Sequence, residues 1–194
     1  MPENFKRHSL SEAKEIMSDL GLDGYRAEQI FKWIWQKGAR SFSEMTDISK
    51  RWRDYLGRTY TIKGSDAVGI RHEGKGAQKY LIQMEDGELI ESVFIREKRR
   101  RTICVSCQVG CPLGCKFCAT ALLGFKRNLL AYEICDQVQL IQESVEEKCT
   151  NVVFMGMGEP FLNTEEVFRT LEIMNSPIGL AIGRRHTTIS TVGL

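Results

Sequence analysis

Three cysteines lie within one short stretch near the middle of the chain. They form a C-x3-C-x2-C pattern, Cys111-Pro-Leu-Gly-Cys115-Lys-Phe-Cys118. Thiolates this close in sequence can bind one metal centre from a single loop. On a four-iron cluster, three cysteines leave one iron without a protein ligand, and that iron can bind and activate a small molecule. The pattern therefore favours an iron–sulfur centre with a chemical role over one that only transfers electrons.

Two more cysteines, Cys104 and Cys107, allow two other interpretations. With Cys115 and Cys118 they form two C-x2-C pairs, as in a four-cysteine zinc site. Only seven residues separate these pairs, whereas zinc sites usually have about 15–20, and Cys111 is left unused. With Cys111 they instead match the end of a bacterial ferredoxin motif, whose first cysteine is missing here. Spacing alone leaves both alternatives open.

A second candidate site is the glycine-rich turn Met155-Gly-Met-Gly-Glu-Pro160, which follows an apolar stretch typical of a buried strand. Glycines such as Gly158 let a ligand approach the backbone, and Glu159 can accept hydrogen bonds from an amine. A tight loop at the end of a strand would explain the same residues. Next to the cysteines in one sheet, however, the turn predicts a site for the amino group of a methionine-like ligand.

The elements that must position these sites begin with helices. Ser9 and Glu12 form a capping-box pattern in front of apolar residues at helical spacing, so we predict a first helix that ends near Gly21. Two further helices are predicted at 25–37 and 47–56. The three tryptophans of the chain lie in this region, and we expect them in its core.

The apolar pattern then changes to that of strands. Residues 79–84 and 89–95 are predicted strands on either side of the turn Glu85-Asp86-Gly87, so we expect a β-hairpin or small sheet over 69–95. From Thr102 onward, predicted strands alternate with predicted helices. They are the strands 103–106, 151–155 and 187–192 and the helices 130–145 and 163–175. This order predicts parallel strands joined by right-handed crossovers.

The predicted fold class is therefore α/β, a partial (β/α) barrel that stops after about three strands. We expect a helical accessory domain at 1–60, a β connector at 61–96 and an incomplete core at 97–194. A complete barrel takes about 200 residues or more, and fewer than half that number follow Thr102. We therefore expect the chain to be a fragment of a longer protein.

The composition indicates a globular protein without a membrane segment. Hydrophobic residues make up 42% of the chain, and the net charge of +2 does not indicate a partner. The sequence contains no signal-peptide core and no apolar stretch of about 18 residues, which makes a cytoplasmic location with free thiols the default. Two basic runs, 98–101 and 184–186, are either solvated loops or a rim that binds nucleic-acid phosphate. Because the first run precedes Cys104, we expect it near the mouth of the site.

Together these stretches resemble the RlmN/Cfr family of radical S-adenosylmethionine (SAM) RNA methyltransferases. The resemblance covers nearly the whole chain, including the helical stretch that begins at Tyr25. The stretches that carry it are Cys104-Val-Ser-Cys-Gln-Val-Gly-Cys111, Cys115-Lys-Phe-Cys118-Ala-Thr, Gly124-Phe-Lys-Arg-Asn-Leu129, Met155-Gly-Met-Gly-Glu-Pro160 and Thr187-Thr-Ile-Ser-Thr-Val-Gly193. It implies a SAM-dependent enzyme with a radical SAM partial barrel.

The resemblance also implies a role for each site residue. The implied cofactor residues are Cys111, Cys115 and Cys118 for a [4Fe–4S] cluster and Gly158, Glu159 and Ser190 for SAM. Cys104 would be the resolving cysteine that breaks a crosslink between protein and RNA, and Glu91 would be the proton acceptor.

The implied reaction is methylation of carbon 2 of an adenosine in 23S ribosomal RNA and of a tRNA adenosine. A related subgroup methylates carbon 8. Carbon 2 is an unactivated ring carbon, so the family first methylates one of its own cysteines and then adds a radical made from that methyl group to the base. The implied partners are ribosomal RNA, tRNA and an electron donor such as flavodoxin, with no membrane and a monomeric full-length protein. The methyl-carrying cysteine has no match here, so we expect the chain alone to be inactive.

Overall fold

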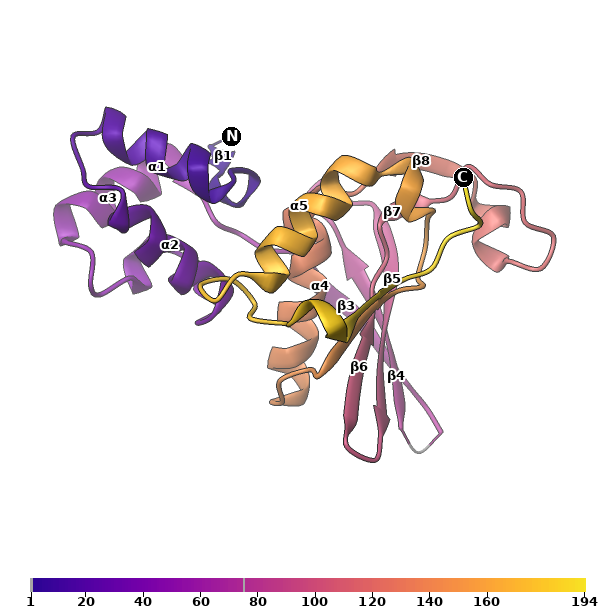
Figure 1. Ribbon diagram of the computed structural model, residues 1–194. Coiled ribbons are helices and arrows are strands. Elements are labelled where there is room, and N and C mark those ends of the chain that lie inside the picture. Colours follow the sequence, from indigo (N-terminus) through magenta and orange to yellow (C-terminus); the bar gives the residue numbers. More distant parts are fainter. Residues whose placement is uncertain (1, 75) are drawn as a thin grey trace. The chain divides into compact units, whose positions relative to one another are not determined.

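The computed structural model describes residues 2–74 and 76–194. The chain forms two compact units, each of which can be followed in Figure 1. The first comprises the residues up to Gly64 together with Asn175–Ala181, and the second comprises Ser65–Met174 and Ile182–Leu194. Within the described residues, no helix is long and apolar enough to cross a membrane.

The first unit is a small helical bundle. Its elements are β1 (Glu3–Asn4), α1 (Leu10–Asp19), α2 (Tyr25–Trp35), α3 (Lys50–Thr59) and β2 (Tyr60–Thr61). The two short strands pair in parallel. The predicted capping box of α1 is confirmed: the backbone N–H of Glu12 donates to Ser9 Oγ at 3.2 Å, and the N–H of Ser9 donates to Glu12 Oε2 at 2.6 Å.

The third helix begins later than the sequence pattern predicts. It begins at Lys50, with Ser49 as its N-cap residue, and the Asp47 carboxylate in front of it accepts a hydrogen bond from Trp33 Nε1 at 2.7 Å. Trp35 is buried with 3% of its surface exposed, whereas Trp33 and Trp52 are half-buried. The prediction that all three tryptophans lie in the core is therefore wrong for two of them.

The second unit is built on a six-stranded sheet with the strand order β10-β9-β6-β5-β4-β3. Its strands are β3 (Asp66–Glu73), β4 (Ala77–Gln83), β5 (Leu89–Glu97), β6 (Arg100–Cys104), β9 (Asn151–Phe154) and β10 (Thr187–Ile189). Neighbours from β3 to β6 are antiparallel, while β6, β9 and β10 are parallel. The predicted parallel core is confirmed. The residues of the expected β connector, 61–96, supply β3, β4 and most of β5, which extend the same sheet.

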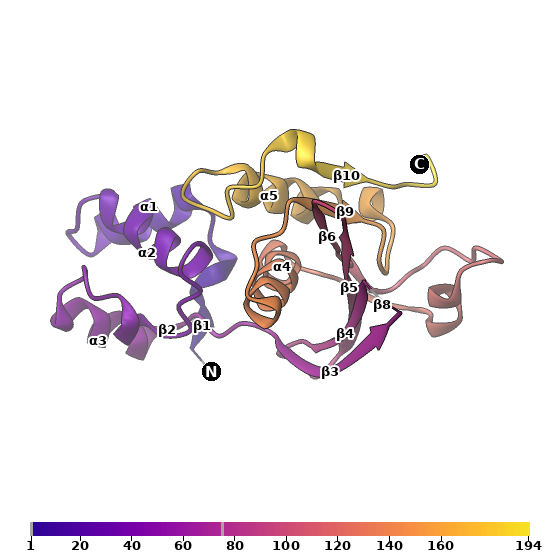
Figure 2. The same cartoon turned by 90° about the horizontal axis from the view of Figure 1, so that it is seen from below.

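Two helices link the parallel strands, α4 (Ala131–Val145) before β9 and α5 (Thr164–Asn175) before β10. Helix α4 lies against one face of the sheet (Figure 2). The Tyr80 hydroxyl of β4 donates to Ser144 Oγ at 3.1 Å. Gln137 makes two hydrogen bonds with the backbone of Ser106, at 2.8 and 2.9 Å. Helix α4 therefore positions the segment that follows β6.

A two-stranded sheet frames the clustered cysteines. Its strands, β7 (Gln108–Gly110) and β8 (Phe125–Asn128), are antiparallel. The residues between them, 111–124, form what we call the cysteine loop. The sequence pattern did not predict these strands, because three and four residues are too few to show an alternating pattern.

The basic run lies at the opposite end of β6 from Cys104. Lys98 and Arg99 form the turn between β5 and β6, and Arg100 begins β6. A strand of this length spans roughly 15 Å at about 3.3 Å per residue. The expectation that the run lies near the mouth of the site is therefore wrong, since it lies at the amino-terminal end of the parallel strands.

Candidate functional site

The carboxyl ends of the parallel strands bring the two candidate sites together. Cys104 ends β6, the glycine-rich turn follows β9, and Ser190 follows β10. The register of the three strands places these ends next to one another. Glu159 and Ser190 thus lie at the same end of the sheet as the chain that leaves β6 toward the cysteine loop. This is the end at which open α/β sheets bind ligands.

Hydrogen bonds join the glycine-rich turn to the segment after β6. The Ser106 hydroxyl donates to the carbonyl oxygen of Glu91 at 2.5 Å and accepts from the backbone N–H of Met157 at 2.9 Å. The backbone N–H of Cys107 donates to the carbonyl oxygen of Met157 at 2.9 Å. The turn is therefore held in a fixed position beside β7.

The glycines of this turn make room for protein. A Cβ on Gly156 would lie 2.7 Å from Ser106 Oγ. Gly158 has φ +102°, and a Cβ there would lie 2.6 Å from the Cβ of Gln108. The sequence left two explanations open for these glycines, the approach of a ligand and a tight loop. In the structure, the close approach of the segment after β6 leaves no room for side chains at Gly156 and Gly158.

Glu159 is buried, with 3% of its surface exposed. Its carboxylate accepts hydrogen bonds from the backbone N–H groups of Phe161 and Val192, each at 3.0 Å, and its own N–H donates to Gln108 Oε1 at 2.9 Å. Burial opposes ionisation, but the hydrogen bonds from Thr191, Phe161 and Val192 outweigh it and hold the pKa of Glu159 below its ordinary value. The ionised carboxylate still has lone pairs that could accept from an amine.

The cysteine loop is closed at its base. The backbone N–H of Cys111 donates to the carbonyl oxygen of Gly124 at 2.9 Å. Gly110 has the left-handed φ of +75°, and a Cβ on it would lie 1.8 Å from that same carbonyl oxygen. The loop can close in this way only with glycine at position 110.

The three cysteines of the loop, Cys111, Cys115 and Cys118, are free thiols and half-buried. Hydrogen bonds from Thr120 lower the pKa of Cys118. Three accessible thiols on one closed loop are a donor set that suits an iron–sulfur cluster. The three sulfurs do not converge in the structure, since no three His, Cys, Asp or Glu side chains in the described part of the chain form a metal-binding group. Metal binding often orders its own ligands, so ligation by these cysteines is a proposal.

A pocket of about 510 Å³ lies beside the base of the cysteine loop. Its lining includes Leu89, Glu91, Val109, Gly110, Leu123 and Met157. The exposed Glu91 carboxylate forms an ion pair with Lys79 Nζ at 3.2 Å. Glu91, the predicted proton acceptor, therefore lines the same mostly apolar pocket as Met157 of the glycine-rich turn and Gly110 at the base of the cysteine loop.

The cysteines after β5 differ in their surroundings. Burial raises the pKa of the half-buried Cys104, and a hydrogen bond with the backbone of Met155 partly offsets this rise. Cys107 is 2% exposed. Burial, together with the nearby Glu159 and Cys111, raises the pKa of Cys107 to about 12. The four cysteines of the alternative zinc site do not form a metal-binding group in the described part of the chain.

Two buried side chains that the sequence analysis did not assign to the site hold its parts together. Gln108 accepts the N–H of Glu159 and donates from Nε2 to Asn128 Oδ1 at 2.8 Å. Asn163, at the start of the predicted helix 163–175, donates from Nδ2 to the carbonyl oxygen of Cys107 at 2.8 Å. The one sequence signal for Gln108 was its place inside the stretch from Cys104 to Cys111.

Comparison with known proteins identifies the class. Residues 105–194 match the Radical SAM superfamily, and residues 4–62 match the ribosomal RNA large subunit methyltransferase N-terminal domain. A crystal structure of a radical SAM methyltransferase from Sphaerobacter thermophilus is similar, with a TM-score of 0.90 and 37% identity over 100% of this chain and 58% of that chain. The second unit is therefore a radical SAM domain. Membership of this superfamily implies a [4Fe–4S] cluster and SAM as cofactors.

Similar curated proteins then identify the family. The chain is 44% identical to a "Probable dual-specificity RNA methyltransferase RlmN" of Dictyoglomus turgidum, over 98% of this chain and 56% of that protein. It is 46% identical to a protein of the same name from Aquifex aeolicus, over 96% of this chain and 54% of that protein. The chain belongs to the RlmN family, as its motifs predicted. It spans about half the length of these relatives.

Proposed function

We propose that this chain supplies the part of an RNA methyltransferase that binds the iron–sulfur cluster and SAM. The proposed residues are Cys111, Cys115 and Cys118 for the cluster and Gly158, Glu159 and Ser190 for SAM. The observation that carries the proposal is the closed cysteine loop at the same end of the parallel strands as the ionised Glu159. Bound there, the cluster would supply one-electron chemistry.

The substrate that we propose is an adenosine of 23S ribosomal RNA and of tRNA, methylated at carbon 2. Similar proteins bear the name of dual-specificity RNA methyltransferases. In the pocket beside the cysteine loop, Glu91 is the proposed proton acceptor, and its ion pair with Lys79 orients it. Cys104, at the end of β6, is the proposed resolving cysteine.

We propose that the methyl-carrying cysteine lies outside these 194 residues. Burial raises the pKa of Cys149 to about 11, and that of Cys107 is about 12. Both thiols therefore stay protonated and are weak nucleophiles. Cys135 is fully buried within α4. We also propose a cytoplasmic location, which the absence of disulfides among the described cysteines supports. For the full-length protein we propose a monomer that receives electrons from a donor such as flavodoxin.

The cluster assignment is tested by anaerobic reconstitution of the chain with iron and sulfide. The parent and the control Cys149→Ser should each bind about four irons and four sulfides. Cys115→Ser and Cys118→Ser should lose most of this iron. Zinc without sulfide in the parent, or full iron content in both loop variants, would overturn the assignment.

The target atom is tested on RNA that the complete enzyme has modified. Digestion to nucleosides followed by chromatography and mass spectrometry should yield 2-methyladenosine from both ribosomal RNA and tRNA. A product that elutes as 8-methyladenosine would move the proposal to carbon 8.

A further inference from the structure

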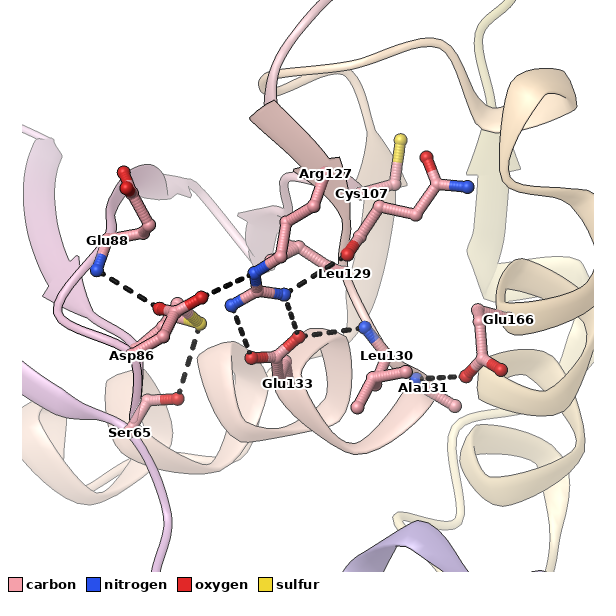
Figure 3. Close-up of polar contacts among 12 residues, drawn as sticks. Ser65, Asp86, Glu88, Cys107, Arg127, Leu129, Leu130, Ala131, Glu133 and Glu166 are labelled. Atoms are coloured by element: carbon pink, nitrogen blue, oxygen red, sulfur yellow. Dashed lines mark hydrogen bonds and ion pairs between the residues drawn. The ribbon is translucent and has the colours of Figure 1, made fainter. Parts of the chain in front are cut away.

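Arg127 is the centre of a charged cluster beside the cysteine loop (Figure 3). Its Nη1 donates to Glu133 Oε2 at 2.8 Å and its Nη2 donates to Glu133 Oε1 at 2.9 Å. Its Nε donates to Asp86 Oδ2 at 2.6 Å. Glu133 is buried, with 3% of its surface exposed. A bidentate pair combined with a second carboxylate fixes the plane of the guanidinium group.

Each partner of Arg127 belongs to a different element. Glu133 lies in the first turn of α4, where its Oε2 also accepts the backbone N–H of Leu130 at 2.8 Å and so caps the helix. Asp86 lies in the turn between β4 and β5 and accepts the backbone N–H of Glu88 at 3.1 Å. Arg127 itself lies on β8, the strand that leaves the cysteine loop. Arg127 therefore connects strand β8 both to the first turn of α4 and to the turn between β4 and β5.

Strand β8 is also connected to the cofactor side of the site. The carbonyl oxygen of Asn128 accepts from Arg127 Nη1 at 3.1 Å. The side chain of Asn128 accepts from Gln108 Nε2 at 2.8 Å, and Gln108 Oε1 accepts the N–H of Glu159 at 2.9 Å. A continuous series of hydrogen bonds thus runs from Arg127 through Asn128 and Gln108 to Glu159.

We infer that Arg127 is a positioning residue that sets the spacing between the cysteine loop and Glu159. The inference rests on the proposed function, in which the loop holds the cluster and Glu159 contacts SAM. SAM must contact the cluster and Glu159 at the same time. A shift of β8 would change the distance between the cysteine loop and Glu159, and SAM could then no longer contact both equally well. Loss of Arg127 should therefore weaken SAM binding without removing a cluster ligand.

The role requires arginine and not only a positive charge. Lysine carries one compact ammonium group, which cannot hold both oxygens of Glu133 and the carboxylate of Asp86 in one plane. Arg127→Lys keeps the charge balance of the cluster but loses this planar geometry. This substitution therefore distinguishes a positioning role of Arg127 from a role that only neutralises the charge of the buried Glu133.

The first measurement uses the cluster-free chain. Hydrogen exchange of residues 108–128, followed by mass spectrometry, should be on the order of tenfold faster in Arg127→Lys than in the parent, the effect of losing one charge-assisted hydrogen bond. Exchange in α1 and α2 should not change. The matched control is Arg96→Met, which removes an exposed ion pair with Glu147 in the same unit and should leave the loop's exchange unchanged.

The second measurement uses the reconstituted chain. Arg127→Lys should contain as much iron as the parent but bind SAM about tenfold more weakly, as measured by the SAM-induced change in the electron paramagnetic resonance spectrum of the reduced cluster. Arg96→Met should match the parent in both readouts.

Equal exchange rates and equal SAM affinity in Arg127→Lys and the parent would overturn the inference. An equal loss of SAM affinity in Arg96→Met would also overturn it, because it would show a general effect of stability. If the parent takes up no cluster, the proposed function fails. The exchange rates of the cluster-free chain then decide by themselves whether Arg127 holds the loop.

Discussion

The Cys118 thiol lies in the cysteine loop, where hydrogen bonds from Thr120 lower its pKa. The Cys107 thiol lies in the core, where burial and the nearby Glu159 and Cys111 raise its pKa to about 12. Each of the two residues ends a C-x2-C pair. At the scale of residues, the same spacing thus gives one thiol that ionises easily and one that stays protonated. The difference matters because the thiolate is the form that reacts and binds metal.

This difference predicts the order in which the thiols react. With iodoacetamide at neutral pH, the native, reduced and cluster-free chain should be alkylated first at Cys118, while Cys107 should react only on unfolding. Peptide mass spectrometry over a time course measures both rates, and the urea-unfolded chain is the control in which the two cysteines should react alike. Equal alkylation rates of Cys107 and Cys118 in the native chain would contradict the difference between their pKa values.

Glu159 predicts a dependence of stability on pH. A carboxyl whose folded pKa is lowered stabilises the fold above its unfolded pKa of about 4.3, and this contribution is lost as the pH falls through the folded pKa. Glu159→Gln should therefore lower the free energy of unfolding by about 1–3 kcal/mol at pH 7, and the difference from the parent should shrink below about pH 4.

Urea unfolding at several pH values measures this difference. The control is the exposed Glu172 on α5, whose change to Gln should have little effect at any pH. If the difference in the free energy of unfolding between Glu159→Gln and the parent grows on acidification, the predicted direction of the pH dependence is wrong.

At the scale of elements, the closure of the β7–β8 hairpin depends on one glycine. A side chain on Gly110 would have to displace the backbone carbonyl of Gly124, and its φ of +75° is itself unfavourable for other residues. Gly110→Ala should therefore open the base of the cysteine loop and lower the free energy of unfolding by more than about 2 kcal/mol. Urea unfolding and the iron content after reconstitution measure the two effects.

The same loop offers the control. A Cβ on Gly114 would meet no described atom within 4 Å, and this glycine has no positive φ. Gly114→Ala should thus keep both stability and iron content. A Gly110→Ala variant that behaves like Gly114→Ala would show that the hairpin does not close as described.

At the scale of the whole second unit, large apolar side chains are exposed around the candidate site. Phe117 and Leu122 of the cysteine loop are 92% and 90% exposed, and Met155 and Val192 are more than half exposed. Strands β3 and β10 are the outer strands of the described sheet. Exposed apolar patches and open strand edges both favour association.

We therefore expect the purified chain to self-associate as its concentration rises. Sedimentation velocity should show an increasing average mass for the parent and a smaller increase for the double variant Phe117→Ser, Leu122→Ser. A mass that stays monomeric and constant over a wide concentration range would contradict this expectation.

The sequence by itself determined the local features of this protein. The capping box at Ser9, the C-x3-C-x2-C spacing and the turn at Glu85 to Gly87 are encoded by residues close together in the chain. The alternation of strands and helices after Thr102 was sufficient to predict parallel strands, because the preference for right-handed crossovers allows few topologies. The motifs together were sufficient to predict the family.

Only the tertiary structure decided features that join distant residues. It placed Lys98 at the far end of β6, showed that Gly158 makes room for Gln108, and brought Asp86 to Arg127 across 41 positions of the chain. Periodicity and spacing describe neighbours along the chain, whereas these contacts depend on how the strands and α4 pack against each other. Burial decides thiol chemistry for the same reason, since desolvation arises only when separate elements enclose a side chain.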